Sequence, residues 1–246
     1  PRHVALRYAT LPIGESGDSL IIATKAGFGT GSTRANIQRT FDISRARLGM
    51  EYVDILYLHR WDDNTPLEET FETLAALQQA GKFGHIGVSN FAAWQVMKAQ
   101  AVAAQMGIRI AMIQPMYNLV KRQAEVEILP MARSEGFAIV PYSPLGGGLL
   151  TGKYANADQG RLIHDPMYKS RYGQAWMHKA ASDLTEIAQD LNVSPITLAV
   201  AWVARNPDIT SPIISASSAD QFQPSVDAMT FKMDDALYNR LTALTP

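Results

Sequence analysis

The chain alternates between short apolar segments and longer helical segments, and this alternation constrains its fold more than any other feature. Six apolar segments are expected to form buried strands, at residues 20–25, 53–59, 83–89, 110–117, 137–142 and 212–214. Helices are expected near residues 34–48, 65–80, 92–106, 122–134, 175–191, 194–204, 219–229 and 234–244. Repeated strand and helix units of this kind predict a parallel sheet covered by helices, which is an α/β fold.

An open doubly wound sheet and a closed barrel both fit this alternation, and two features favour the barrel. The units are regularly spaced, and the turn after the first strand lacks the Gly-x-Gly-x-x-Gly fingerprint of doubly wound nucleotide-binding folds. Polar side chains also stand at the same end of every predicted strand. They are Lys25, His59, Ser89, Asn90, Gln114, Tyr142, Ser143, Ser215 and Ser217. Because this end is the catalytic face of a (β/α)8 TIM barrel, we predict that architecture.

The composition excludes several classes of function. A formal net charge of -1, from 22 basic and 23 acidic residues, argues against a nucleic-acid partner, which would require a basic surface. No apolar run reaches the roughly 18 residues of a membrane span, so no membrane partner is expected. The absence of cysteine rules out disulfides and thiolate chemistry, and together with the lack of a secretory signal it predicts a cytoplasmic protein.

A glycine-rich stretch at residues 142–153 follows the fifth predicted strand. Glycines allow a backbone to approach a ligand closely and to adopt positive φ angles. Tyr142 offers a flat face to an aromatic ring, and Lys153 offers a positive charge to a phosphate. The stretch therefore suits a dinucleotide, although a glycine-rich turn with a buried tyrosine is an equally good interpretation of this segment alone.

Lys25 and His59 are the candidate catalytic residues, because each closes an otherwise apolar strand. A lysine can change the pKa of a neighbour, and a histidine can donate a hydrogen bond to a carbonyl oxygen near neutral pH. A Schiff-base lysine, as in barrel aldolases, is the alternative use of Lys25. A metal site at Asp62 and Asp63 is not expected, because the spacing does not suit metal ligands. Trp61 is expected to line a substrate pocket.

Several stretches, taken together, resemble the aldo-keto reductase family, and they occur in the family's order over about residues 20–230. They are IIATKAG (21–27), RLGMEYVDILYLHRWDDNTPLEET (47–70), AGKFGHIGVSNF (80–91), IQPMYNL (113–119), VPYSPLGGGLLTGKY (140–154) and PIISASSADQ (212–221). The chain is most similar to the branch that includes bacterial reductases and potassium-channel β subunits. The resemblance implies a (β/α)8 barrel that binds NADPH without a Rossmann fold and reduces aldehydes and ketones by hydride transfer.

The resemblance also implies roles for individual residues. Lys25 matches the lysine that lowers the pKa of a catalytic tyrosine, and His59 matches the histidine that orients the substrate carbonyl. Tyr142 matches the aromatic residue that stacks on the nicotinamide ring. The other expected cofactor contacts are Ser89, Asn90 and Gln114 at the nicotinamide amide, Ser143, Pro144, Leu145, Gly147, Lys153 and Arg161 near the phosphates, and Ser215, Ser217 and Gln221 near the adenosine.

The chain departs from the family pattern at two places. The family's catalytic tyrosine and aspartate precede the lysine, but residues 1–24 hold no Asp-x-x-x-Tyr-Gly pattern, and N-terminal barrel strands are missing. We expect residues 1–246 to be a single barrel domain with further segments before about residue 15 to 20 and in loops. A true deletion of these strands, which would imply an inactive or unfolded enzyme, is the alternative. Several relatives carry a basic residue, which would pair with the 2′-phosphate of NADPH, where Ser218 stands in this chain. NADPH is still the expected cofactor, but NADH is less excluded than usual.

These features predict an NADPH-dependent oxidoreductase that reduces small-molecule aldehydes and ketones to alcohols. The alternative is an NADPH-binding regulatory or sensor protein with little turnover, as the similarity to channel β subunits suggests. His59 argues against the alternative, because those subunits carry asparagine at that position. The physiological substrate and the oligomeric state do not follow from the sequence.

Overall fold

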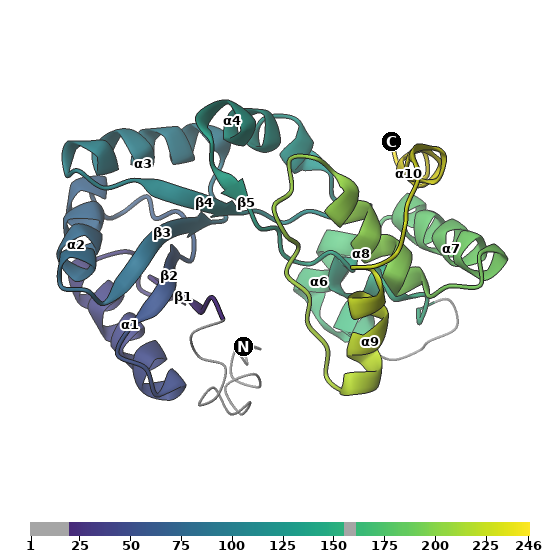
Figure 1. Ribbon diagram of the computed structural model, residues 1–246, viewed down its shortest axis with the longest axis horizontal. Coiled ribbons are helices and arrows are strands. Elements are labelled where there is room, and N and C mark those ends of the chain that lie inside the picture. The colour runs from purple at the N-terminus through teal and green to yellow at the C-terminus, as the bar shows by residue number, and fades with distance from the viewer. Residues whose placement is uncertain (1–19, 155–160) are drawn as a thin grey trace. The chain divides into compact units, whose positions relative to one another are not determined.

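The structure is a computed structural model that describes residues 20–154 and 161–246 (Figure 1). The chain divides into two compact units. Unit 1 ends at Gln114 and also includes Glu135–Ala138, whereas unit 2 comprises Pro115–Ser134 and Ile139–Pro246. The expectation that residues 1–246 form one barrel domain stays a prediction.

Unit 1 is an alternation of parallel strands and helices, as the sequence predicts. Its elements are β1 (Ala23–Ala26), α1 (Arg34–Leu48), β2 (Val53–Leu58), α2 (Leu67–Gln79), β3 (Phe83–Ser89), α3 (Ala93–Gln105) and β4 (Ile110–Gln114). The sheet has the order β1-β2-β3-β4-β5, in which β5 is Ala138–Ile139, and the pairs from β1 to β4 are parallel. The α/β class with a parallel sheet is therefore confirmed, with consecutive strands adjacent as in a barrel.

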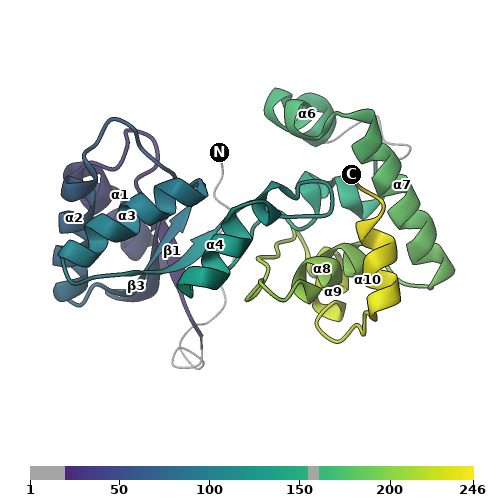
Figure 2. The same ribbon diagram turned by 90° about the horizontal axis from the view of Figure 1, so that it is seen from above.

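The two faces of this sheet differ toward the carboxyl ends of the strands. Helices α1, α2 and α3 all lie on one side of the strands (Figures 1 and 2). Leu56, Leu58 and Val88 are at most 1% exposed and alternate with Tyr57 and Ser89. Because successive side chains of a strand point to opposite faces, the apolar set faces the helices, and Tyr57 and Ser89 face the other side.

The first helix shows how local sequence sets the element boundaries. The Thr33 side chain accepts a hydrogen bond from the Asn36 backbone N–H, which caps α1 at its start. Gly49 ends the helix with a φ of 67°, a left-handed conformation that glycine adopts without a steric penalty. The predicted helix at residues 34–48 is therefore confirmed at both ends.

Unit 2 is mainly helical. Strand β5 (Ala138–Ile139) spans the boundary, because Ala138 belongs to unit 1 and Ile139 belongs to unit 2. The helices are η5 (Gln123–Glu125), α4 (Ile128–Glu135), η6 (Gly146–Thr151), α5 (Arg161–His164), α6 (Pro166–Tyr172), α7 (Ala175–Asp190), α8 (Pro195–Arg205), α9 (Ala219–Asp227) and α10 (Asp235–Thr242). Among the described residues, no single helix has the length and apolarity to cross a membrane; α7 and α8 meet these criteria only as a pair bent by 103°.

Two strand predictions in this part of the chain are wrong in extent. The strand expected at 137–142 is only two residues long, and the segment at 212–214 forms no strand. The segment nevertheless lies beside β5, since Ile213 N donates to Pro141 O at 2.8 Å and Thr210 N donates to Ile139 O at 2.8 Å. Pro141 and Pro212 have no amide hydrogen, so a continuous ladder cannot form there.

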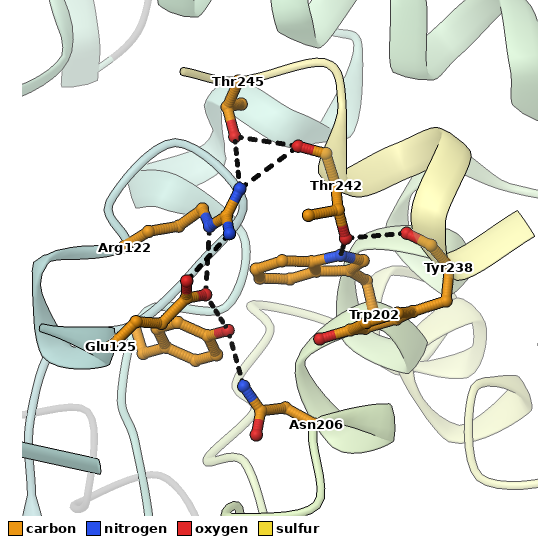
Figure 3. A network of polar contacts seen from close by, with 8 residues as sticks. Arg122, Glu125, Trp202, Asn206, Tyr238, Thr242 and Thr245 are labelled. Carbon is orange, nitrogen blue, oxygen red and sulfur yellow. Dashed lines mark hydrogen bonds and ion pairs between the residues drawn. The ribbon is translucent and has the colours of Figure 1, made fainter. Parts of the chain in front are cut away.

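A polar and aromatic network ties the start of unit 2 to its last helix (Figure 3). The Trp202 indole is fully buried and stacks on Tyr117, with ring centroids 5.3 Å apart, and on Tyr238, at 5.9 Å. Its Nε1–H donates to Thr242 Oγ1 at 2.9 Å. Arg122 donates two hydrogen bonds to the Glu125 carboxylate, at 3.0 and 2.8 Å, and another to the Thr242 carbonyl at 3.1 Å.

The same network satisfies the buried Tyr117 hydroxyl. Tyr117 donates to the Glu125 carboxylate at 2.6 Å and accepts a hydrogen bond from Asn206 Nδ2 at 2.9 Å. Because both partners of the hydroxyl are in place, its burial costs little. The network therefore fixes the chain just after β4, from which unit 2 begins, against α8 and α10.

Candidate functional site

The candidate site in unit 1 is a row of polar residues at the carboxyl ends of β1 to β4. Lys25 lies opposite Tyr57, which lies opposite Gly87, and Ser89 lies opposite Gln114. His59 directly follows Leu58, and its backbone N–H donates to the Ala26 carbonyl at 2.9 Å. The parallel register therefore brings the predicted catalytic and nicotinamide residues of unit 1 to one edge of the sheet.

Hydrogen bonds connect the predicted nicotinamide residues to one another. The Ser89 hydroxyl donates to the Gln114 carbonyl at 2.9 Å. The Asn90 side-chain amide donates to the His59 carbonyl at 2.9 Å and to Ser89 Oγ at 3.1 Å. Asn90 has a φ of 59°, a strained conformation for a residue with a side chain and one that is common at functional sites. Ser89, Asn90, Gln114 and His59 thus form one connected group.

Lys25 lies over the ring of Tyr57, with its Nζ 5.5 Å from the ring centroid. Burial lowers the pKa of Lys25, because a charged ammonium loses hydration there. The electron-rich face of the ring attracts the ammonium. The lysine is thus held in the site rather than extended into solvent.

Aromatic side chains surround the end of β2. Phe28 packs against His59 with ring centroids 4.8 Å apart, and Trp61 contacts Phe91 at 5.3 Å and Trp94 at 5.6 Å. The Trp61 Nε1–H donates to Asp63 at 2.7 Å, and this bond sets the orientation of the indole. Phe28 therefore places apolar surface next to His59, and Phe91 and Trp94 pack around Trp61.

Asp62 holds the loop that carries Phe28. Its Oδ2 accepts hydrogen bonds from the Ser32 backbone N–H at 2.7 Å and from the Thr65 hydroxyl at 2.6 Å. A Cβ on Gly31, which has a φ of 92°, would lie 2.3 Å from this carboxylate oxygen. Burial raises the pKa of Asp62, but the hydrogen bonds from Thr65, Ser32 and Asn64 outweigh it, so that the net shift is downward.

The lowered pKa of Asp62 predicts how an Asp62→Asn variant responds to pH. A carboxyl group whose folded pKa lies below its unfolded value of about 3.9 stabilises the fold above that value. This contribution is lost as the pH falls through the lower folded pKa. The difference in unfolding free energy between wild type and variant should therefore be largest near neutrality and shrink on acidification. Urea titrations at several pH values measure it, and a difference that does not change with pH would contradict the prediction.

The glycine-rich loop of unit 2 has the positive φ angles that the sequence predicts. Gly146, Gly147 and Gly148 have φ values of 57°, 66° and 100°. A Cβ on Gly147 would lie 2.8 Å from the Tyr168 ring. The loop is a short 3-10 segment, η6, rather than a long helix. The Tyr168 ring therefore packs directly against the glycine backbone, which has no Cβ to prevent this approach.

Asn118 fixes the start of this loop and was not singled out in the sequence. It is fully buried, and its Nδ2 donates to the Ser143 carbonyl at 2.9 Å, while its Oδ1 accepts from the Val120 N–H at 3.1 Å. Ser143 itself has a φ of 60°. Tyr142 N donates to the Pro115 carbonyl at 2.9 Å. These bonds hold Tyr142 and Ser143 in place where the chain leaves β5 and enters the glycine-rich loop.

Two cations lie near the loop. Lys153 Nζ would be 3.3 Å from a Cβ on Gly148, so its ammonium lies against the glycine backbone. Arg171, which the sequence analysis missed, lies over the Tyr168 ring at 5.9 Å. Burial raises the pKa of Tyr142, and the charge of Arg171 partly offsets this rise. Both cations suit a phosphate group.

The predicted adenosine residues lie on the segment beside β5 and at the start of α9. Ser215 and Ser217 are exposed, and Ser217 N donates to the Gln221 side chain at 3.3 Å. Ser218 caps α9 by accepting from Gln221 N at 3.3 Å. Pro144 is buried and Leu145 is half-buried in the loop. Arg161 begins α5, but its side chain lies outside the described part of the structure.

Within residues 20–154 and 161–246, no group of three or more histidine, aspartate or glutamate side chains is arranged to hold a metal ion.

Tyr57, in unit 1, is a further residue of this region that the sequence did not predict. A period of two leading to His59 is the signal that could have identified it, because Tyr57 and His59 share a face of β2. Arg171 offered no comparable signal, since it lies in an irregular polar stretch.

Comparisons with known proteins agree with these features. A family model described as the aldo/keto reductase family matches residues 5–246. The L-glyceraldehyde 3-phosphate reductase of Escherichia coli K12 is 35% identical over 226 residues, which are 86% of this chain and 65% of that protein. A probable voltage-gated potassium channel subunit beta of Arabidopsis thaliana is 32% identical over 88% of this chain and 70% of that protein.

An uncharacterized oxidoreductase, YrpG, of Bacillus subtilis is also 32% identical, over 85% of this chain and 64% of that protein. The chain thus spans slightly less than two thirds of the length of the bacterial relatives it matches. The family model covers nearly the whole chain, and the relatives include both reductases and the channel-subunit branch. The chain therefore belongs to the aldo-keto reductase family.

Proposed function

We propose that the protein is an NADPH-dependent oxidoreductase that reduces aldehydes and ketones to alcohols. The observation that carries the proposal is the row at the carboxyl ends of β1 to β4. This sheet edge carries Lys25, His59, Ser89, Asn90 and Gln114. All of them except Lys25 belong to one hydrogen-bonded group. When bound, the cofactor supplies the hydride.

The residues of unit 1 have complementary tasks in this proposal. His59 donates a hydrogen bond to the carbonyl oxygen of the substrate, and Phe28 holds the imidazole from one side. Lys25 supplies a positive charge that lowers the pKa of a tyrosine acting as proton donor, as the family resemblance implies. Ser89, Asn90 and Gln114 hold the carboxamide of the nicotinamide. The bonds from Asn90 to Ser89 and from Ser89 to the Gln114 backbone carbonyl fix the Ser89 and Asn90 side chains before the ligand arrives.

In unit 2, the family resemblance implies further cofactor contacts. Tyr142 stacks on the nicotinamide ring, Lys153 and Arg171 pair with phosphate oxygens, and Ser215, Ser217 and Gln221 contact the adenosine. The donor set fits the group, since the Lys153 ammonium lies against the Gly148 backbone of the glycine loop. The aromatic cluster of Trp61, Phe91 and Trp94 favours a substrate with an apolar or aromatic carbonyl.

Titration of the protein with NADPH and with NADH, followed by tryptophan fluorescence, tests the binding part of the proposal. NADPH should bind with the lower dissociation constant. Turnover with 4-nitrobenzaldehyde then tests the reaction. Binding of NADPH with little turnover would favour a regulatory or sensor protein, and a borohydride-trapped adduct on Lys25 would favour Schiff-base chemistry. A cytoplasmic location stays a prediction.

A Gly147→Ala variant should weaken NADPH binding. The added Cβ would lie 2.8 Å from the Tyr168 ring, in a backbone with a φ of 66° that disfavours side chains, so the loop must shift. Gly107→Ala is the matched control, since Gly107 has a φ of 70° but no atom near its Cβ position. We expect a higher dissociation constant for the first variant alone. Equal effects in both variants would mean that backbone strain, and not the loop's contacts, is responsible.

A further inference from the structure

Tyr57 is a buried polar residue that the proposed reaction does not use. It lies in β2 on the same face as Lys25 and Gly87, and only 2% of its surface is exposed. Its hydroxyl lies near the Gln114 side chain. Burial raises the pKa of Tyr57 to about 12, and the Gln114 side chain partly offsets that rise. The phenol is therefore neutral at physiological pH.

Tyr57 contacts the two functional ends of the unit 1 site at once. Its ring lies under the Lys25 ammonium, with 5.5 Å between Nζ and the ring centroid. Its hydroxyl, at the far end of the ring, lies near the side chain of Gln114, which is two strands away on β4. Tyr57 therefore lies between the candidate catalytic lysine and a predicted nicotinamide ligand.

The neighbouring strand makes room for this ring. Gly87 lies between β2 and β4 in the sheet, and a Cβ at this position would lie 2.3 Å from Cδ1 and from Cε1 of Tyr57. A side chain at residue 87 would therefore displace the ring. The ring crosses the Gly87 backbone, and this crossing allows a residue of β2 to reach a residue of β4.

We propose that Tyr57 is a positioning residue, which holds the Gln114 amide in place for the nicotinamide through its hydroxyl and the Lys25 ammonium through its ring. The proposal rests on the proposed function. The two contacts are made by different parts of the side chain, so they can be separated by substitution. Tyr57→Phe removes only the hydroxyl, whereas Tyr57→Leu removes the ring as well.

The hydroxyl is tested by a double-mutant cycle on NADPH binding with Tyr57→Phe and Gln114→Ala. One neutral hydrogen bond is worth about 1 kcal/mol, so Tyr57→Phe should raise the dissociation constant about 3- to 10-fold in the wild-type background. In the Gln114→Ala background the same substitution should have almost no effect, because its partner is already gone. Equal effects in both backgrounds, or no effect in either, would overturn the proposal.

The role of the ring is tested by measuring how substitutions of Tyr57 change kcat. Tyr57→Leu should lower kcat roughly 10-fold or more, and Tyr57→Phe should restore most of it, since the aromatic face over Lys25 is kept. Tyr52→Phe, an exposed tyrosine at the start of β2, is the control. If kcat in Tyr57→Phe is as low as in Tyr57→Leu, the ring has no such role.

These outcomes are distinct from failure of the proposed function. If wild-type protein does not bind NADPH, the proposed function is wrong and Tyr57 has no ligand to position. If wild type binds NADPH and Tyr57→Phe binds it equally well, only the role of Tyr57 is refuted. Thermal melting of each variant checks folding, and the binding cycle uses the Phe substitution, which keeps the packing against Gly87.

Discussion

A Lys25→Met variant is expected to lose at least about 10²-fold in kcat/KM for carbonyl reduction, in the range of general acid and base contributions. Lys25 is held over the Tyr57 ring at the end of β1, and methionine keeps the length of the side chain but not the charge. The loss should be in kcat, because the cofactor contacts assigned to unit 1 come from β3 and β4.

NADPH binding separates this role from a structural one. The dissociation constant of Lys25→Met should stay within about threefold of wild type, since no uniform binding interaction is removed. Lys98→Met, an exposed lysine of α3, is the matched control and should retain full activity. If Lys25→Met also loses cofactor binding, the lysine is a cofactor ligand or a structural residue. Because burial lowers the pKa of Lys25, its ammonium should lose its proton earlier than that of an exposed lysine as the pH rises. The contribution of Lys25 to kcat should be lost at that lower pH.

A Trp202→Ala variant is expected to lower the unfolding free energy by about 3 to 5 kcal/mol, the usual cost of truncating a buried aromatic side chain. The indole is fully buried, stacks on Tyr117 and Tyr238, and donates to Thr242. Its loss leaves a cavity where α8 and α10 meet the start of unit 2 (Figure 3). Urea unfolding measures the change.

Two further variants identify the source of this effect. Trp202→Phe keeps an aromatic ring but leaves Thr242 without the indole donor, so it should cost less than Trp202→Ala and more than about 1 kcal/mol. Trp94→Ala removes a tryptophan that is 59% exposed and should cost less than about 1 kcal/mol. Similar losses for Trp94→Ala and Trp202→Ala would show that the network is not a special source of stability.

The sequence was most informative where local signals and burial agree. Thr33 and Gly49 are recognisable as the ends of α1, and the observed helix matches the prediction at both. The apolar residues of β2 and β3 likewise predict their strands, because the faces packed against helices must exclude water. Lys25, His59, Ser89 and Gln114 were found because each interrupts or ends such an apolar run.

Tertiary hydrogen bonding was harder to predict. Prolines 115, 141 and 212 reduce the number of backbone donors, so β4 and β5 are shorter than expected and residues 212–214 pair without forming a strand. Tyr57 and Asn118 lie near residues that are far away in the sequence, Gln114 and Ser143. No local sequence pattern identifies which distant residue such a side chain faces. For Tyr57, the register of the strands supplied this information.

The central claim is that this chain transfers a hydride from NADPH to a carbonyl carbon. The most direct test is to incubate the protein with 4-nitrobenzaldehyde and NADPH deuterated at the nicotinamide C4, and to analyse the alcohol by mass spectrometry. The account predicts 4-nitrobenzyl alcohol carrying deuterium at the former carbonyl carbon, with the signal greatly reduced for Lys25→Met. Tight NADPH binding without deuterated alcohol for any aldehyde tried would contradict it and would leave a cofactor-binding protein without reductase activity.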